Sequence, residues 1–149
     1  AMILPPIRIE KNHSSVTASE LQMGERLFID MRDVRLLGFE LARRDYQIGD
    51  IIQLGLYWRA RTKPQGDYLV SVQMRDSTGH VAFETQSRPA QNTYPTPNWS
   101  AGEVLLDWHD WQISPTIQDG SYTLRVELLD SIDRAVLGQA DLAMVTIGK

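Results

Sequence analysis

The chain has 149 residues, a formal net charge of −4 and no cysteine. This length predicts a single domain, and the lack of cysteine excludes disulfides, thiolate metal sites and cysteine nucleophiles. A mildly acidic chain without a basic cluster is a poor binder of nucleic acid, because phosphate contacts need grouped lysine and arginine. No apolar run approaches the roughly 18 residues of a membrane-spanning helix, so we expect no direct membrane insertion by this chain.

Residues 1–24 are expected to form an extended leader or linker. Pro5 and Pro6 favour extended backbone, and the polar residues that follow show no sustained period. The start at Ala1 and Met2 suggests a piece cut from a longer protein, and a native N-terminus is the alternative. A single folded domain is therefore expected over residues 25–149.

From residue 25 onward the apolar residues recur with a period of two, which is typical of β-strands. The clearest run covers residues 52–60, and Trp58 lies on its apolar face and is expected in the core. Residues 46–50 are interpreted as a turn, because Gly49 is free to take positive φ. The expected strands cover residues 26–29, 34–41, 52–60, 68–75, 81–85, 104–113, 122–128 and 135–147.

Strands at this spacing, without a convincing amphipathic helix, indicate an all-β sandwich or barrel. Each strand shows one apolar face, and two packed antiparallel sheets bury one face of every strand. We therefore expect an immunoglobulin-like antiparallel β-sandwich of seven to eight strands rather than a closed barrel.

One long irregular stretch, residues 87–102, interrupts the strands. It contains three prolines together with Tyr94 and Trp99. Loops of this length are usually functional or packed by their own side chains. The two aromatic side chains are candidates for a ligand or partner surface shared with Trp108. The alternative is that they clamp the loop onto the sandwich.

The densest group of chemically useful side chains is Asp107-Trp108-His109-Asp110-Trp111. On a strand, Asp107, His109 and Trp111 share one face, while Trp108 and Asp110 share the other. We expect Trp111 in the core and Trp108 at the surface, where an exposed indole face can stack on a sugar ring. Asp110 beside it completes the candidate surface. The alternative is that Trp108 packs under a loop or simply sits on the surface.

The same cluster could also bind a metal ion or take part in catalysis. Asp107 and His109 could supply two metal ligands, but zinc needs a third or fourth. The ordinary alternative is a carboxylate that accepts backbone or imidazole hydrogen bonds. Glu103 with Asp107 or Asp110 could form a glycosidase pair, but that chemistry needs two carboxyl groups across a cleft. We therefore expect no catalytic residue, no bound metal and no cofactor.

Short motifs occur in an order shared with a known family. They are VRLLGF at residues 34–39, IGD at 48–50, LGLYWRA at 54–60, DSTGHV at 76–81, YPTPNW at 94–99, GEVLLD at 102–107 and DGSYTL at 119–124. The chain resembles the β-sandwich domain that follows membrane-embedded glycosyltransferase-like segments, of the lipid-linked mannosyltransferase type, in many bacterial proteins. It departs from that pattern at Glu127, where the family has a glycine.

The resemblance implies a non-catalytic accessory or interaction domain on the extracytoplasmic face of a bacterial membrane. Its partner would be the glycosyltransferase-like membrane segment of the same longer chain, or a glycan, and any transferase activity would lie in that membrane segment. The alternative function is a free-standing carbohydrate-binding module.

Overall fold

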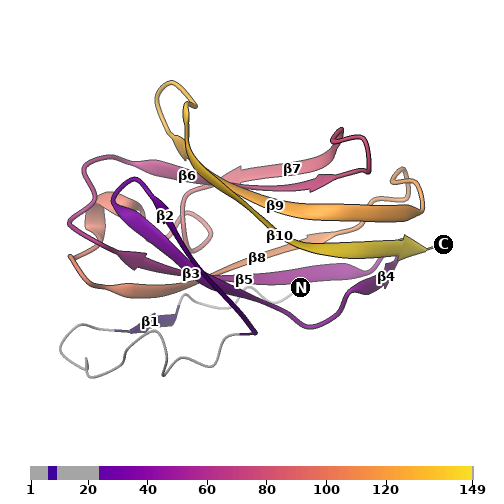
Figure 1. The fold of residues 1–149 in the computed structure, drawn as a ribbon, viewed down its shortest axis with the longest axis horizontal. Helices are drawn as coiled ribbons and strands as arrows, with labels where there is room; N and C mark the ends of the chain where they lie inside the picture. Colours follow the sequence, from indigo (N-terminus) through magenta and orange to yellow (C-terminus); the bar gives the residue numbers. More distant parts are fainter. Residues whose placement is uncertain (1–6, 10–23, 149) are drawn as a thin grey trace.

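The chain folds into two packed sheets (Figure 1), and the computed structural model describes residues 7–9 and 24–148. Ten strands lie within these residues, five in each sheet. The first sheet has the order β1 (Ile7–Ile9), β8 (Val104–Gln112), β5 (Ile51–Ala60), β3 (Val34–Leu41) and β2 (Glu25–Met31). The second has the order β4 (Asp45–Gln47), β10 (Val136–Gly148), β9 (Gly120–Asp130), β6 (Tyr68–Arg75) and β7 (Val81–Ser87).

The expected all-β, immunoglobulin-like sandwich is confirmed, with ten described strands in place of the predicted seven to eight. One added strand, β4, lies where the sequence predicts a turn over residues 46–50. It pairs in parallel with the end of β10, with Tyr46 opposite Ile147. The other, β1, falls within the predicted leader and pairs with β8, while residues 1–6 and 10–23 of that leader lie outside the described residues. A strand of three residues is too short to show a period of two. Whether such a strand forms therefore depends on the longer strand that it pairs with.

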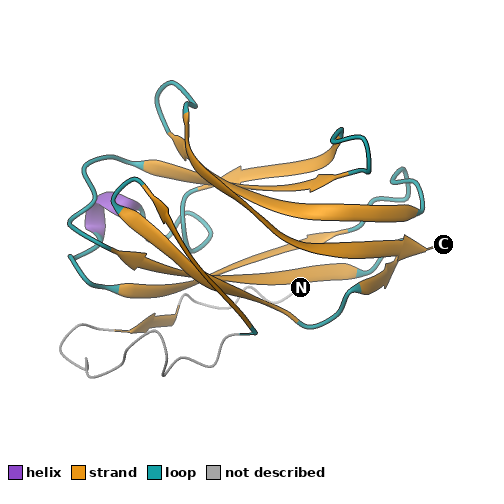
Figure 2. Cartoon of the chain, viewed as in Figure 1, coloured by secondary structure: helices purple, strands orange, loops and turns teal. Residues whose placement is uncertain are grey.

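Connections of very different length link the strands, and a short helical turn lies among those of the described residues (purple in Figure 2). This turn, the 3₁₀ helix η3 (Thr96–Asn98), lies in the long loop between β7 and β8. No helix within residues 7–9 and 24–148 has the length and apolar character needed to cross a membrane.

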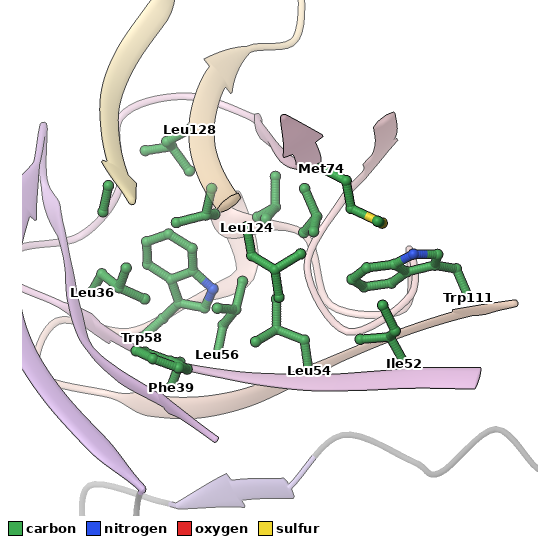
Figure 3. Close-up of a cluster of buried hydrophobic side chains, with 14 of the residues drawn as sticks. Leu36, Phe39, Ile52, Leu54, Leu56, Trp58, Met74, Trp111, Leu124 and Leu128 are labelled. Carbon is green, nitrogen blue, oxygen red and sulfur yellow. The ribbon is translucent and has the colours of Figure 1, made fainter. Parts of the chain in front are cut away.

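The hydrophobic core fills the space between the two sheets (Figure 3). The alternation along β5 places Ile52, Leu54, Leu56, Trp58 and Ala60 on its inner face, and all five are fully buried. These side chains pack in one buried cluster with Leu36 and Phe39 from β3, Met74 from β6, Leu124 and Leu128 from β9, and Trp111 from β8. The core positions predicted for Trp58 and Trp111 are therefore confirmed.

The outer face of the second sheet holds a hydrogen-bonded polar network instead of freely solvated side chains. The amide of Gln73 donates to Glu127 Oε1 over 3.1 Å, and Arg75 Nη2 lies 3.4 Å from Glu127 Oε2. Ser71 Oγ donates to Glu84 Oε2 over 2.7 Å. Glu127 therefore links β9 to β6 through its carboxylate.

The two sheets approach each other closely on the side of β2 and β10. A Cβ atom at Gly138 would lie 2.5 Å from Met31 Cγ and 2.7 Å from Met31 Cβ, so β10 can pass β2 only because residue 138 lacks a side chain. On the opposite side, β7 faces β8, and a small pocket lies between these two strands.

Replacing Gly138 with alanine is expected to destabilise the fold by about 1–3 kcal/mol, because the new methyl group forces Met31 or the backbone to move. Urea unfolding of the variant measures this loss. Gly148→Ala is a matched control on the same strand, since a Cβ atom there would meet only Tyr46 O at 3.9 Å. Equal midpoints for the two variants would contradict the close approach at Gly138.

Candidate functional site

A small pocket opens where β7 of the second sheet faces β8 of the first. Its cavity volume is about 170 Å³. Engineered cavities of about 150 Å³ hold one benzene ring, so this pocket has room for one six-membered ring. It is lined by Thr85 and Ser87 from β7, Gln91 and Asn92 from the following loop, and residues 108–111 from β8.

The pocket lies next to the part of β8 that β1 does not pair with. Strand β1 pairs with Val104, Leu105 and Leu106 only, so within the described residues no strand covers the rest of that edge. The pocket is lined by residues 108–111 and therefore by side chains from both faces of β8.

The inner face of β8 supplies Trp111 and His109 to the pocket. The Trp111 ring stacks on Phe83 of β7, with 5.4 Å between ring centroids and 15° between planes. Only 8% of Trp111 is exposed. This aromatic pair joins the two sheets and forms a rigid apolar wall. His109 is also buried, and its ring is held by Asp107.

The outer face of β8 supplies Trp108. The indole is half-buried, since one part of it packs against a second apolar cluster outside the main core. A Cβ atom at Gly55 would lie 3.0 Å from Trp108 Cζ3, so the ring lies directly over that glycine. Only part of the indole is left for a ligand, at the side that lines the pocket. The members of the second cluster are Leu37, Tyr57, Val104 and Leu106.

Asp107 connects the core, the pocket and the adjoining loop through its fully buried carboxylate. Oδ1 accepts a hydrogen bond from the backbone N–H of Ala90 over 2.7 Å. Oδ2 lies 2.7 Å from His109 Nε2 and accepts from Trp58 Nε1 over 3.3 Å. The expected alternative to a metal ligand, a carboxylate that takes backbone and imidazole hydrogen bonds, is thus the observed arrangement.

The loop segment held by Asp107 has an unusual backbone. Ala90, Gln91 and Asn92 have φ values of 56°, 56° and 68°, which place three consecutive non-glycine residues in the left-handed region. Such residues cost about 1 kcal/mol or more each and persist where the surroundings impose them, often at ligand sites. The Asn92 side chain accepts from the backbone N–H of Arg88 over 2.8 Å and closes the turn. Gln91 and Asn92 are thereby fixed at the pocket.

Several polar groups of the pocket are available to a ligand. Within the described residues, the side chains of Ser87, Gln91 and Asp110 make no hydrogen bond or ion pair. Buried side-chain atoms without a hydrogen-bond partner also concentrate here, since three of the four in the described residues belong to residues that line the pocket. These three are Thr85 Oγ1, Trp108 Nε1 and Trp111 Nε1. Buried polar atoms are normally paired, so this concentration is a second sign of a ligand site.

Tyr94 and Trp99 lie elsewhere and are not among the residues that line the pocket. Trp99 is only 1% exposed, and its Nε1 donates to Tyr94 O over 3.0 Å. The two rings stack with centroids 6.3 Å apart, and the Tyr94 hydroxyl donates to the buried Glu103 carboxylate. This is the arrangement of the alternative interpretation, in which the two aromatic residues clamp the loop. Trp108 and Asp110 are the two candidate residues that the structure brings together at the pocket.

The same loop is anchored to the start of β6 near Tyr68. Thr96 Oγ1 accepts from Tyr68 N over 3.0 Å and donates to Gly66 O over 2.7 Å. The Tyr68 hydroxyl donates to Asp33 Oδ2 over 3.0 Å. Burial, with a smaller contribution from the hydrogen bond to this carboxylate, raises the pKa of Tyr68 to about 12.

Tyr68 is expected to make the fold sensitive to alkali. A free tyrosine has a pKa near 10, so the raised pKa in the folded state adds stability that is complete below about pH 10. That stability is lost as the pH rises through about 12, and its upper limit is about 2–3 kcal/mol. Urea unfolding at about pH 9 and about pH 11 should show a steeper loss for the natural protein than for Tyr68→Phe. Equal losses would contradict the raised pKa.

Sequence reasoning missed half of the pocket. Thr85 and Ser87 belong to an ordinary edge strand, and Gln91 and Asn92 to a loop whose path depends on Asp107. The one usable signal was the length of the irregular stretch at residues 87–102. The Asp107–His109 pair is engaged in hydrogen bonds, and residues 24–148 contain no group of three or more histidine, aspartate or glutamate side chains placed to hold a metal ion.

Comparisons with known proteins bear on the fold. No model of a known protein family matches the sequence, and no curated protein matches it. Among solved structures, a Niemann-Pick type C2 protein from the Japanese carpenter ant is 3% identical with a TM-score of 0.54, over 75% of this chain and 90% of that protein. The C-terminal domain of Wzt is 8% identical with a TM-score of 0.54, over 78% of this chain and 74% of that domain.

A third solved structure shares the fold within a much larger protein. The alkylpurine DNA glycosylase AlkC from Pseudomonas fluorescens, bound to DNA containing an abasic site analog, is 15% identical with a TM-score of 0.54. The similarity covers 78% of this chain, and this chain spans only 31% of AlkC. At these identities the likeness establishes the β-sandwich fold that the sequence predicts.

Proposed function

We propose that this protein is a non-catalytic binding domain that holds one sugar ring of a glycan in the pocket between β7 and β8. The observation that carries the proposal is the combination, in a cavity of about 170 Å³, of two indoles with hydroxyl, amide and carboxylate groups. A sugar ring presents axial C–H groups to an aromatic surface and hydroxyls around its edge. A sugar site therefore needs both an aromatic surface and polar side chains that form hydrogen bonds.

The size and chemistry of the pocket support a sugar more than other small ligands. Sites for drug-sized or lipid-like molecules usually have volumes of about 300–1,000 Å³ and predominantly apolar walls. Here Ser87, Gln91 and Asp110 offer unused donors and acceptors. Their positions are fixed by the strands and by the loop turn at residues 90–92, which limits the ordering cost of binding.

The carboxylates that the sequence offers for a glycosidase pair, Glu103, Asp107 and Asp110, support a binding role without catalysis. Asp107 is occupied by three structural hydrogen bonds. Glu103 accepts from the Tyr94 hydroxyl and from Ser100 N over 2.9 Å. Asp110 is the one carboxylate that lines the pocket, whereas glycoside hydrolysis requires two acting on the same bond.

A binding titration of the purified chain with a glycan panel tests the proposal. Trp108→Ala and Gln91→Gly should each weaken binding about tenfold or more, because they remove a wall of the pocket and a hydrogen-bonding amide. Glycine at residue 91 keeps the left-handed backbone accessible. Gln118→Gly, in the exposed loop before β9, is the matched control. Saturable binding that both pocket variants retain, with their folding confirmed by circular dichroism, would contradict the pocket as the site.

The resemblance noted in the sequence supports a second, wider role. Under it, the domain is the extracytoplasmic accessory part of a bacterial membrane protein of the glycosyltransferase-like type, and it presents the pocket to the glycan that the membrane segment handles. The test is the full reading frame from which the chain comes. Several long hydrophobic segments before residue 1 would support this role. A short secreted protein, or a neighbouring hydrolase module, would support a free-standing carbohydrate-binding module.

A further inference from the structure

The pocket has a one-sided electrostatic character. Of its eight lining residues, one is a carboxylate, Asp110, and none is lysine or arginine. Asp110 makes no ion pair within the described residues, so no cationic side chain among them neutralises its charge. The remaining lining groups are hydroxyls, amides, two indoles and His109.

The groups just behind the pocket do not reverse this character. Arg88 follows Ser87 in the chain, but its Nε lies 2.9 Å from Asp67 Oδ2 and its Nη2 lies 2.8 Å from the same oxygen. His109 is hydrogen-bonded to the buried Asp107, so a second carboxylate stands behind the imidazole. A charged ligand entering the pocket therefore meets net negative charge.

From these charges we propose that the pocket selects its sugar by charge: it accepts hexosamines and neutral hexoses and rejects hexuronic acids. This inference rests on the proposed function and names the ligand class of the same site. A protonated amino group on the ring pairs with Asp110. A ring carboxylate meets an uncompensated like charge, and its desolvation is not repaid by a cationic partner.

The unused acceptor capacity of the pocket points the same way. Asp110 accepts hydrogen bonds only, and the Gln91 side chain offers both a carbonyl and an amide. An ammonium or hydroxyl group can donate to the Asp110 carboxylate and to the Gln91 side-chain carbonyl. A carboxylate can only accept, so it leaves Asp110 without a partner while burying part of its charge.

The experiment measures dissociation constants for matched sugars of one ring series at a time. For the gluco, galacto and manno series, the methyl glycosides of the hexosamine, the neutral hexose and the hexuronic acid are titrated against the full chain by NMR at neutral pH. In the series that binds, the hexosamine should bind at least about tenfold more tightly than the hexuronic acid. The neutral hexose should lie between them. Raising the salt concentration should bring the dissociation constants of the hexosamine and the hexuronic acid closer together, because the difference between them is electrostatic.

Variants of Asp110 separate charge selection from simple binding. Asp110→Asn keeps the size and the hydrogen-bonding reach and should bring the hexosamine and hexuronic acid constants within about threefold of each other. Asp110→Lys should reverse the order. Asp119→Asn removes an exposed carboxylate in the turn before β9 and should leave the order unchanged.

The outcomes distinguish the two proposals. If neutral sugars bind and the hexuronic acid binds equally well or better, charge selection is overturned and the sugar pocket stands. If the natural protein selects by charge and Asp110→Asn still does, Asp110 is not the selecting group and the inference fails. If no sugar of any series binds, the proposed function fails and the inference fails with it.

Discussion

Replacing Trp58 with alanine is expected to destabilise the protein by about 3–5 kcal/mol, because it removes a large side chain from the core. Trp58 is 0% exposed and lies on the inner face of β5 among the buried side chains of both sheets (Figure 3). The substitution leaves a cavity in place of the indole and removes the N–H that Asp107 Oδ2 accepts. Urea unfolding monitored by circular dichroism measures the loss.

Trp58→Phe separates the two contributions. It keeps an aromatic ring in the core but removes the indole N–H, so its loss should be clearly smaller than that of the alanine variant. An alanine variant with an unchanged urea midpoint would show that Trp58 does not carry the core. Equal losses for both variants would show that the hydrogen bond to Asp107 outweighs packing.

Replacing Asp107 with alanine is expected to cost about 3–5 kcal/mol, because buried hydrogen-bonding groups lose their shared acceptor. Ala90 N–H, His109 Nε2 and Trp58 Nε1 all lie against this one carboxylate. The effect should extend to ligand binding, since the left-handed turn at residues 90–92 would lose the contact that holds it. Thermal or urea unfolding measures the loss of stability, and a sugar titration measures the loss of ligand binding.

Asp107→Asn is the informative companion. The amide keeps the shape and still accepts from Ala90, so folding should suffer less than in the alanine variant. Its NH₂ group cannot accept a hydrogen bond from Trp58 Nε1, so part of the loss of stability should remain. A fully stable alanine variant that binds sugar normally would contradict the positioning role of Asp107.

The fold was largely predictable from local patterns. The alternation at residues 52–60 set the inner face of β5, and the buried positions of Trp58 and Trp111 followed from the same period. The two strands that were missed, β1 and β4, are three residues long. Each of them forms by pairing with the edge of a longer strand. A segment of three residues is too short for its hydrophobic pattern to predict such pairing.

The candidate site was predictable only in part. The cluster at residues 107–111 was visible as a dense chemical group, and Asp110 and Trp108 do line the pocket. The half-buried state of Trp108 was not visible, because it depends on Gly55 of the neighbouring strand lying under the ring. Likewise, Trp99 is a core residue because its loop folds back over the sandwich.

The amino-acid sequence alone determines the class of this protein: strands with one apolar face, joined by turns, that must pair into two sheets to bury that face. Tertiary structure decides where a ligand can bind. The pocket joins Thr85 and Ser87 to residues 91–92 and 108–111, and the loop turn that closes it is held by Asp107 from a strand outside the loop. Such contacts depend on which strands become neighbours, and the packing of the whole chain decides this.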